Sequence, residues 1–154
     1  MTPYLTNILF FLAAFIAMEC VAWLTHKYIM HGLLWVLHKD HHKKESRGFF
    51  EHNDFFFLIF ALPGILGLFY GMQNGFNFLF WIGLGITAYG FTYFFVHDIF
   101  IHQRFKILRN ADNNYFKSIR RAHKVHHKHL GKDDSECFGM LWVPLKYFKT
   151  KNQE

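Results

Sequence analysis

The sequence predicts an all-α fold, an integral membrane helical bundle with three spans and with further helices at the membrane surface and in the cytoplasm. Three observations lead to this fold class. The chain of 154 residues is 52% hydrophobic and 21% aromatic, which is too apolar for a simple water-soluble domain of this size. Its apolar residues gather in three long runs, and its histidines gather beside the ends of those runs. We therefore expect one membrane domain, residues 1–154, that carries a histidine-rich di-metal site.

The three apolar runs are residues 5–24, 55–71 and 76–96. Three polar residues interrupt the first run, one of them Glu19, and the other two runs contain no charged residue. At the 1.5 Å rise of an α-helix, runs of 20, 17 and 21 residues can cross the roughly 30 Å of bilayer hydrocarbon, the middle one by the smallest margin. Each run therefore predicts one membrane span.

The first helix is expected to begin near Pro3, because proline is tolerated in the first turn of a helix. It should end near the helix breaker Gly32. A short amphipathic stretch, residues 33–42, then lies at the inner membrane surface. A polar loop, residues 43–48, leads from there toward the second span.

Asn53 or Asp54 is expected to cap the second span, and the turn GMQNG joins it to the third span in a helical hairpin. The third span continues into the cytosol through the string HDIFIH. Residues 113–130 have the pattern of a basic amphipathic helix. The apolar tail, residues 138–148, is short and contains a proline and a lysine, so we expect it in the membrane interface and not across the bilayer.

All 17 Lys and Arg residues lie in two segments, five in residues 27–47 and twelve in residues 104–151. Positive residues accumulate in the loops that remain cytoplasmic. With three spans, both segments fall on the same side, so the N-terminus is predicted outside and the C-terminus inside. This topology accounts for the net charge of +6, and we expect the lipid bilayer and no nucleic acid as a partner, because no basic stripe alternates with stacking aromatics.

Ten of the twelve histidines form four boxes, two with the spacing His-x4-His and two with the spacing His-x2-His-His. On a helix, positions i, i+3 and i+4 share a face, so each HxxHH triplet points three imidazoles in one direction. The members of an i, i+5 pair stand about 140° apart on a regular helix, so they can flank a site from a helix that is ending or bind two neighbouring ions. Since one ion rarely takes more than six ligands, the ten predict two metals. They are His26, His31, His38, His41, His42, His97, His102, His123, His126 and His127.

Other uses of these histidines fit the sequence less well. Haem ligation requires histidines that face each other inside the bilayer, and structural zinc usually brings thiolates, whereas only Cys137 lies on the predicted inner side. A neutral set of imidazoles suits iron with activated oxygen. His52 and His129 lie outside the boxes, and we interpret them as structural. A membrane protein that binds or transports a metal without redox chemistry is the alternative from another class.

The boxes HKYIMHG, HKDHH, HDIFIHQR and AHKVHH resemble those of the bacterial β-carotene 3-hydroxylases, which belong to the fatty acid hydroxylase and sterol desaturase superfamily of membrane non-haem di-iron oxygenases. The resemblance covers nearly the whole chain. It implies that the ten box histidines bind two iron ions and that O2 is the co-substrate. It also implies hydroxylation at C3 of each β-ionone ring of β-carotene, giving β-cryptoxanthin and then zeaxanthin. With the predicted topology, the metal site would lie on the cytoplasmic side of the bacterial inner membrane.

The resemblance leaves a second substrate class open, because fatty-acyl or sterol hydroxylases and desaturases use similar boxes. In either case the substrate is apolar and must reach the metal site from within the bilayer. Phe91, Tyr93, Phe94 and Phe95, just before His97, are candidates for lining the inner end of its cleft. Plain helix packing is the other interpretation of this aromatic run.

Two carboxylates are candidate site residues. Glu19 precedes His26 by seven residues on nearly the same helix face, and an acid inside the hydrocarbon is functional by default. It can accept the distal N–H of a metal-binding histidine, bind the metal itself, or make a structural hydrogen bond to another span. Asp98, adjacent to His97, can orient an imidazole or pair with Arg104.

The electrons for such a reaction must come from another protein, because the chain has no dinucleotide-binding, P-loop or flavin motif. An acidic ferredoxin served by an NAD(P)H reductase is the expected donor. Arg120, Arg121 and Lys124 could dock it through charge complementarity, and contact with anionic lipid is the other interpretation of these residues.

Overall fold

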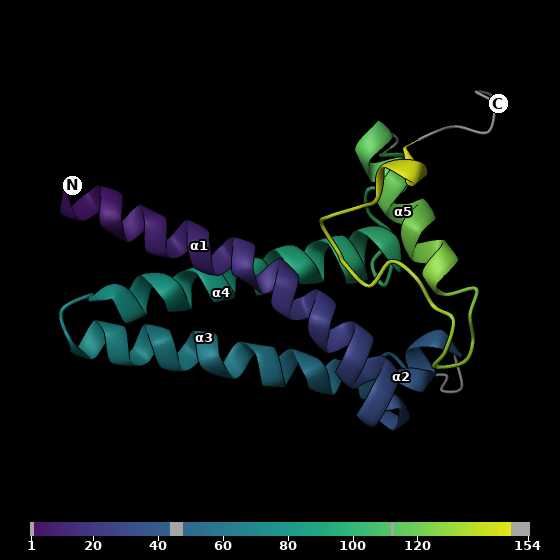
Figure 1. Ribbon diagram of the computed structural model, residues 1–154, viewed down its shortest axis with the longest axis horizontal. Coiled ribbons are helices and arrows are strands. Elements are labelled where there is room, and N and C mark those ends of the chain that lie inside the picture. The colour runs from purple at the N-terminus through teal and green to yellow at the C-terminus, as the bar shows by residue number, and fades with distance from the viewer. Residues whose placement is uncertain (1, 44–47, 112, 149–154) are drawn as a thin grey trace.

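The computed structural model describes residues 2–43, 48–111 and 113–148, and within these ranges every regular element is helical (Figure 1). The prediction of an all-α fold is confirmed, while most of the predicted loop 43–48 falls outside the described residues. The elements in chain order are α1 (Pro3–Leu24), the π-helical segment η1 (Thr25–Leu33), α2 (Trp35–His42), the 3₁₀ turn η2 (His52–Asp54), α3 (Phe55–Gln73), α4 (Phe78–Phe94), the π-helical segment η3 (Phe95–Ile101), α5 (Asn114–His126) and the 3₁₀ turn η4 (Leu145–Tyr147).

Three helical stretches of the described chain are long and apolar enough to cross a bilayer, namely Pro3–Leu33, His52–Gln73 and Phe78–Ile101. Their surfaces carry large apolar side chains that the protein leaves uncovered, such as Ile16 and Ile65, which are 66% and 58% exposed. So much exposed apolar surface is unfavourable in water but is covered by acyl chains in a membrane. The chain is therefore an integral membrane helical bundle, as the three apolar runs predicted.

Helix α4 is central to the bundle because it packs against both α3 and α1 (Figure 1). Glycines permit both contacts. At Gly83 a Cβ atom would lie 2.6 Å from the backbone nitrogen of Leu68 on α3, and at Gly85 it would lie 2.4 Å from the carbonyl oxygen of Phe11 on α1. Small residues at such positions let helix backbones approach closely, which is a main source of helix association in membranes. The histidine boxes are therefore carried by a close-packed scaffold.

The two ends of the bundle differ in character. The N-terminus and the turn between α3 and α4 lie at one end, whereas α2 and α5 lie at the other (Figure 1). The described parts of both basic segments consequently share one end with the histidine boxes. This is the arrangement that the distribution of Lys and Arg predicted.

Helix α3 begins where the sequence predicted, with Asp54 at the N-cap position, although the Asp54 side chain makes no capping hydrogen bond to this helix. That side chain instead forms a capping box with Glu51, which closes the preceding turn η2. Helix α5 ends at His126 and not near residue 130, because the chain leaves the helix there and turns back over the histidines.

Of the tail after α5, residues 127–148 are described, and they are mostly irregular and contain only the short turn η4. Met140, Val143 and Tyr147 are buried in a cluster with Ile119 of α5. Trp142 remains 81% exposed. As expected, residues 138–148 form no spanning helix. They do not simply lie in the membrane interface, however, because several of their side chains are buried against α5.

Candidate metal centre

The first His-x4-His box lies in the π-helical segment η1, which continues α1, and the second runs from His97 in the π-helical segment η3, which continues α4, to His102 directly after it. Backbone hydrogen bonds of a π-helix link residues five apart, and the N–H of His102 donates to the carbonyl of His97 at 2.9 Å. The wider turn brings the members of each pair together, with ring centroids 5.2 Å apart for His26 and His31 and 4.5 Å apart for His97 and His102. The expected separation of about 140° is wrong because it assumed a regular α-helix.

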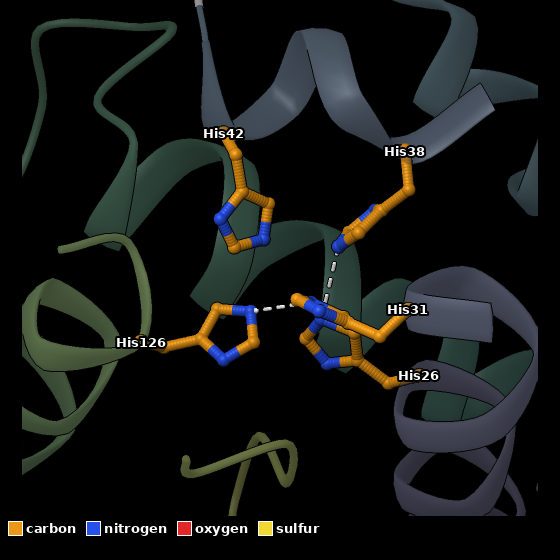
Figure 2. A group of neighbouring side chains, drawn as sticks. All are labelled: His26, His31, His38, His42 and His126. Atoms are coloured by element: carbon orange, nitrogen blue, oxygen red, sulfur yellow. Dashed lines mark hydrogen bonds between the residues drawn. The ribbon is translucent and has the colours of Figure 1, made fainter. Parts of the chain in front are cut away.

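Five histidines from three elements form the first cluster, and one ring nitrogen of each lies within 4.8 Å of the others. All five residues are buried. Figure 2 shows their rings directed toward a common centre from η1, α2 and α5. The members are His26, His31, His38, His42 and His126.

The second cluster adjoins the first. His41, His97, His102 and His123 each offer a ring nitrogen within 4.8 Å of the others. His127 lies beside them, with its ring centroid 4.5 Å from that of His123 and 4.8 Å from that of His41. The structure thus brings all ten box histidines together at one end of the bundle, in a group of five and a group of four, with His127 beside the second group and its ring centroid also 4.5 Å from that of His42.

Each HxxHH box is divided between the two clusters. We expected the three rings of a box to point in one direction. This holds for the first and last rings, but the middle ring points toward the neighbouring cluster. His41 of α2 crosses to the second cluster, and His126 of α5 crosses to the first. Each cluster therefore receives one His-x4-His pair, one i, i+4 pair and one crossing histidine. The i, i+4 pairs are His38 with His42 and His123 with His127.

The Nδ1 atoms in the first cluster all donate to oxygen acceptors. His38 donates to the side-chain oxygen of Asn53 at 2.6 Å. The other four rings donate to backbone carbonyls at 2.9 to 3.0 Å. A carbonyl oxygen only accepts, so Nδ1 carries the proton and Nε2 is left with a free lone pair. Metal-binding histidines almost always have such a partner on their other ring nitrogen.

In the second cluster two of the rings have carboxylates as the corresponding acceptors. His41 donates from Nδ1 to Glu51 at 2.8 Å, and His97 donates from Nδ1 to Asp98 at 3.2 Å. Arg104 holds both carboxylates, since its guanidinium lies 3.2 Å from Glu51 and 3.0 Å from Asp98. Asp98 therefore combines the two roles that were predicted as alternatives, orienting an imidazole and pairing with Arg104.

Glu51 and Asn53 are site residues that the sequence did not reveal. Both lie just before α3, where an acid and an amide are ordinary helix-start residues. One feature of the sequence could have indicated them. Both residues lie between a histidine box and a membrane span, and polar side chains at that depth are expected to have a partner in the metal site. Asp54 belongs to the same group, because it accepts two hydrogen bonds from Arg104, at 2.7 and 3.1 Å.

The Nε2 atoms face one another across each cluster. Because Nδ1 carries the single proton of these neutral rings, such a contact is not a hydrogen bond but a meeting of two lone pairs, which repel unless a cation lies between them. The dashed lines in Figure 2 mark two of these contacts. The Nε2 to Nε2 distances are 3.1 Å for His26 and His38, 3.2 Å for His31 and His126, and 3.0 Å for His41 and His97.

Two further ring nitrogens support the same interpretation. Within the described part of the chain, Nε2 of His42 and Nε2 of His127 are buried without a hydrogen-bond partner. A buried polar atom that lacks a partner is costly, and an acceptor nitrogen aimed into a histidine cluster is satisfied by a metal ion. The donor set therefore fits two transition-metal ions.

Burial lowers the pKa of imidazoles in both clusters that lie outside the membrane spans. It is the largest cause that lowers the pKa of His42 to about 4, that of His126 to about 3 and that of His38 to about 2. The pKa of His41 and that of His123 are also held well below the usual 6.5, by burial and then by the neighbouring His97. A metal binds the neutral ring, so the clusters hold their donors ready at physiological pH.

Glu19 does not contact the histidines in the described structure. Its Oε1 accepts the backbone N–H groups of residues 140–142, each at 2.9 Å, and its Oε2 accepts the hydroxyl of Tyr89 at 2.7 Å. Of the three predicted roles, a hydrogen bond to another span is the one that the structure shows. Seven residues separate Glu19 from His26, roughly 10 Å along the helix, which is too far for the side chain to reach the ring.

His52 and His129, which we interpreted as structural, contribute no ring to either cluster. The ring of His52 is 73% exposed and donates from Nδ1 to Asp40 at 2.8 Å. His129 contributes its backbone carbonyl, which accepts a hydrogen bond from Nδ1 of His42 at 2.9 Å.

An apolar cavity of about 280 Å³ lies between α1, α3 and α4 and reaches His97 of the second cluster. Phe91, Tyr93 and Phe94 line it, and the ring of Tyr93 stacks on His97 with a centroid distance of 5.0 Å. Phe95, also expected there, does not line the cavity and is 44% exposed, because the helix turns its side chain outward. The cavity links the membrane bundle to the second cluster.

Two of the three basic residues expected to dock an electron donor are structural. Arg120 donates to four backbone carbonyls of residues 100–111 and lies 4.0 Å from the ring centroid of Phe100. Arg121 donates to the carbonyl of Tyr147 at 2.7 Å. Irregular segments leave carbonyls that need donors, and these guanidinium groups supply them. Of the three, Lys124 is exposed.

A membrane bundle that gathers ten imidazoles in two adjacent clusters belongs to the class of integral membrane proteins able to hold two metal ions in a histidine-rich site. This chain is a member of the fatty acid hydroxylase family, since the family model of that description matches residues 11–148. It is thus a hydroxylating membrane enzyme, as predicted, and the alternative of a non-redox metal transporter finds no support.

Curated relatives agree with the family. The beta-carotene hydroxylase of Pantoea ananas is 41% identical over 92% of this chain and 79% of its own length. That of Paracoccus sp. (strain PC1) is 36% identical over 91% of this chain and 86% of its own length. The chloroplastic beta-carotene 3-hydroxylase of Gentiana lutea is 42% identical over 74% of this chain and 36% of its own length. No solved structure gives a significant match to this chain.

Proposed function

We propose that this protein hydroxylates β-carotene at C3 of its β-ionone rings, giving β-cryptoxanthin and then zeaxanthin, with O2 as co-substrate. The observation that carries the proposal is the apolar cavity between the membrane helices, which extends to His97. The bacterial relatives are beta-carotene hydroxylases, and an enzyme for so apolar a substrate has to receive it from the bilayer. We propose further that residues 1–154 act as one domain in the bacterial inner membrane, with the clusters at the cytoplasmic face.

Two non-haem iron ions are the proposed cofactors, one in each cluster. When bound, they supply the reductive activation of O2 that hydroxylation of an unactivated carbon requires and that acid–base side chains do not provide. The chain buries the rings, which shields them from water, and it fixes the orientation of seven of them through their Nδ1 acceptors. The proposed ligands are His26, His31, His38, His42 and His126 in the first cluster and His41, His97, His102, His123 and His127 in the second.

The size of the cavity supports hydroxylation of one ring at a time. Its 280 Å³ is near the lower end of the roughly 300–1,000 Å³ of small-molecule pockets, so it encloses one β-ionone ring and the adjoining part of the polyene. The rest of the substrate would extend along the membrane helices. Phe91 and Phe94 provide apolar walls that exclude water, and Tyr93 stacks on the ring of His97 where the cavity reaches the second cluster.

The proposed source of electrons is a ferredoxin reduced by an NAD(P)H-dependent reductase. The absence of nucleotide-binding and flavin motifs from the sequence supports an external donor. With Arg120 and Arg121 engaged in the fold, exposed lysines such as Lys124 and Lys128 on α5 and just after it are the proposed contacts for an acidic protein.

A fatty-acyl chain is the second candidate substrate, because the matching family is described as fatty acid hydroxylase. The apolar cavity would accept an acyl chain or a sterol as readily as a polyene, and desaturation is the related reaction. Analysis of the lipids and pigments of one host separates these substrates.

Expression in a host that accumulates β-carotene tests the proposal directly. We expect the wild-type chain to convert the pigment to β-cryptoxanthin and zeaxanthin, as measured by chromatography. His126→Ala, which removes one ring of the first cluster, should leave β-carotene unchanged at a similar protein level. Unchanged β-carotene with the wild-type protein, together with hydroxylated fatty acids or sterols, would assign the second substrate class instead.

Gly90→Leu is expected to lower product formation by about 10- to 100-fold without loss of iron. Gly90 lines the cavity, and a Cβ atom added there meets no heavy atom within 4 Å, so the new side chain would occupy space proposed for the substrate. Pigment chromatography and metal analysis of the purified variant measure the two effects. Full conversion of β-carotene by Gly90→Leu would show that the substrate uses another route.

A further inference from the structure

The segment after α5, residues 129–142, forms a strap over the first cluster and has no regular secondary structure. Four of its backbone carbonyls are the Nδ1 acceptors of that cluster. Four of the five rings therefore take their orientation from an irregular stretch of backbone. The pairs are His42 with the carbonyl of His129, His31 with that of Lys132, His126 with that of Glu136, and His26 with that of Phe138.

The far end of the strap is bound to Glu19 on α1. Three successive N–H groups, those of Met140, Leu141 and Trp142, donate to Oε1 at 2.9 Å each. Successive N–H groups that surround one anionic oxygen form a backbone nest, and charge-assisted hydrogen bonds are stronger than neutral ones. The strap also approaches Glu19 closely, since a Cβ atom at Gly139 would lie 3.1 Å from Oε1.

An irregular segment requires such an anchor to keep its carbonyls in place. The strap lacks the repeated backbone hydrogen bonds of a helix or sheet, so its position depends on contacts at a few points. One of these lies at Glu136, whose carboxylate accepts the hydroxyl of Tyr147 at 2.8 Å. Another is the hydroxyl of Tyr115, which donates to the carbonyl of Leu141 at 2.8 Å. The third is the nest on Glu19, next to Phe138, whose carbonyl orients His26.

We propose that Glu19 is a positioning residue for the first cluster and acts on the metal through the strap. It touches no imidazole, but it fixes the backbone whose carbonyls set the tautomer and the direction of four rings. His41 and His97 of the second cluster do not share this dependence, because they donate to the side chains of Glu51 and Asp98. The inference rests on the proposed function in one respect, that the first cluster binds a metal ion.

The test uses the purified full-length protein, titrated with Fe²⁺ without oxygen, and two measurements. Hydrogen–deuterium exchange reports the order of the strap, and metal analysis reports the iron bound per chain. Glu19→Gln and Glu19→Leu are expected to accelerate exchange over residues 129–142 and to weaken iron binding at the first cluster by about 10- to 100-fold. At an Fe²⁺ concentration just sufficient to fill both clusters of the wild type, bound iron should fall from two per chain toward one.

Tyr89→Phe is the matched control. It removes only the hydroxyl that donates to Oε2 of Glu19 and leaves the three backbone donors in place, so both irons and slow exchange should be retained. Combining Glu19→Gln with His26→Ala assigns the effect to a cluster. Since His26→Ala already disables the first cluster, the added substitution should cause no further loss of iron.

Wild-type iron affinity in both Glu19 variants would overturn the proposal, as would equal losses of iron in Tyr89→Phe and Glu19→Gln. If Glu19→Leu fails to fold, Glu19→Gln decides by the same two measurements, because it keeps the size of the side chain and an acceptor oxygen. A wild-type protein that binds no iron at all would instead contradict the proposed function. The two failures are therefore distinguishable.

Discussion

His41→Ala is expected to lower hydroxylation at least 100-fold, on the order of the largest effect of losing an outer partner of a metal ligand, and to reduce the iron bound. His41 is the ring that α2 contributes to the second cluster, and its Nε2 lies 3.0 Å from Nε2 of His97. The substitution removes a donor and also leaves Glu51 without the N–H that it accepts. Pigment chromatography and metal analysis of the purified variant measure the two losses.

His52→Ala is the control for this experiment. His52 lies near the same clusters but outside them, and its ring is 73% exposed. Exposed side chains away from special features contribute little, so activity should stay within about twofold of wild type. Undiminished product and iron in His41→Ala would contradict the assignment of the second cluster.

Gly83→Ala is expected to destabilise the bundle by about 1–3 kcal/mol, the usual cost of overpacking. The added Cβ would lie 2.6 Å from the backbone nitrogen of Leu68 and 2.8 Å from the carbonyl oxygen of Gly64, so α3 would have to move away from α4. A loss of stability would be informative, because replacing glycine by alanine inside a helix usually increases stability by about 1 kcal/mol. Thermal unfolding in detergent, followed by helical circular dichroism, measures the change.

Gly90→Ala provides the comparison on the same helix. A Cβ atom there meets nothing within 4 Å, so this variant should unfold at or slightly above the wild-type temperature. Equal stability of Gly83→Ala and Gly90→Ala would rule out close contact between α3 and α4 at this point.

The membrane bundle could be predicted from the sequence because its determinants are local. A run of about 20 apolar residues specifies a span wherever it occurs, and the distribution of 17 Lys and Arg residues places the ends of the spans. The convergence of the ten histidines follows from these two facts. The division of each HxxHH box between two clusters could not be predicted. Residue spacing shows which side chains share a helix face, but it does not show how many other histidine-bearing elements pack against that face.

The remaining features of the site depend on contacts or backbone geometry that spacing does not encode. The π-helical form of η1 and η3 changes the angle between residues five apart, and nothing in the apolar runs distinguishes it from an α-helix. The acceptor role of Glu19 links positions 121 to 123 residues apart in the chain. From the sequence, Glu19 was an acid near a histidine box, and only the path of the tail assigns its partners.

The crossing of His41 and His126 sets the order in which this protein can mature. Each cluster takes rings from α2, which precedes the α3–α4 hairpin, and from α5, which follows it. On the ribosome, a nascent chain that has released only the first two spans offers four of the five histidines of the first cluster but only His41 of the second. The second cluster is therefore assembled after the third span has been inserted, and both clusters are complete only after residue 127 has emerged.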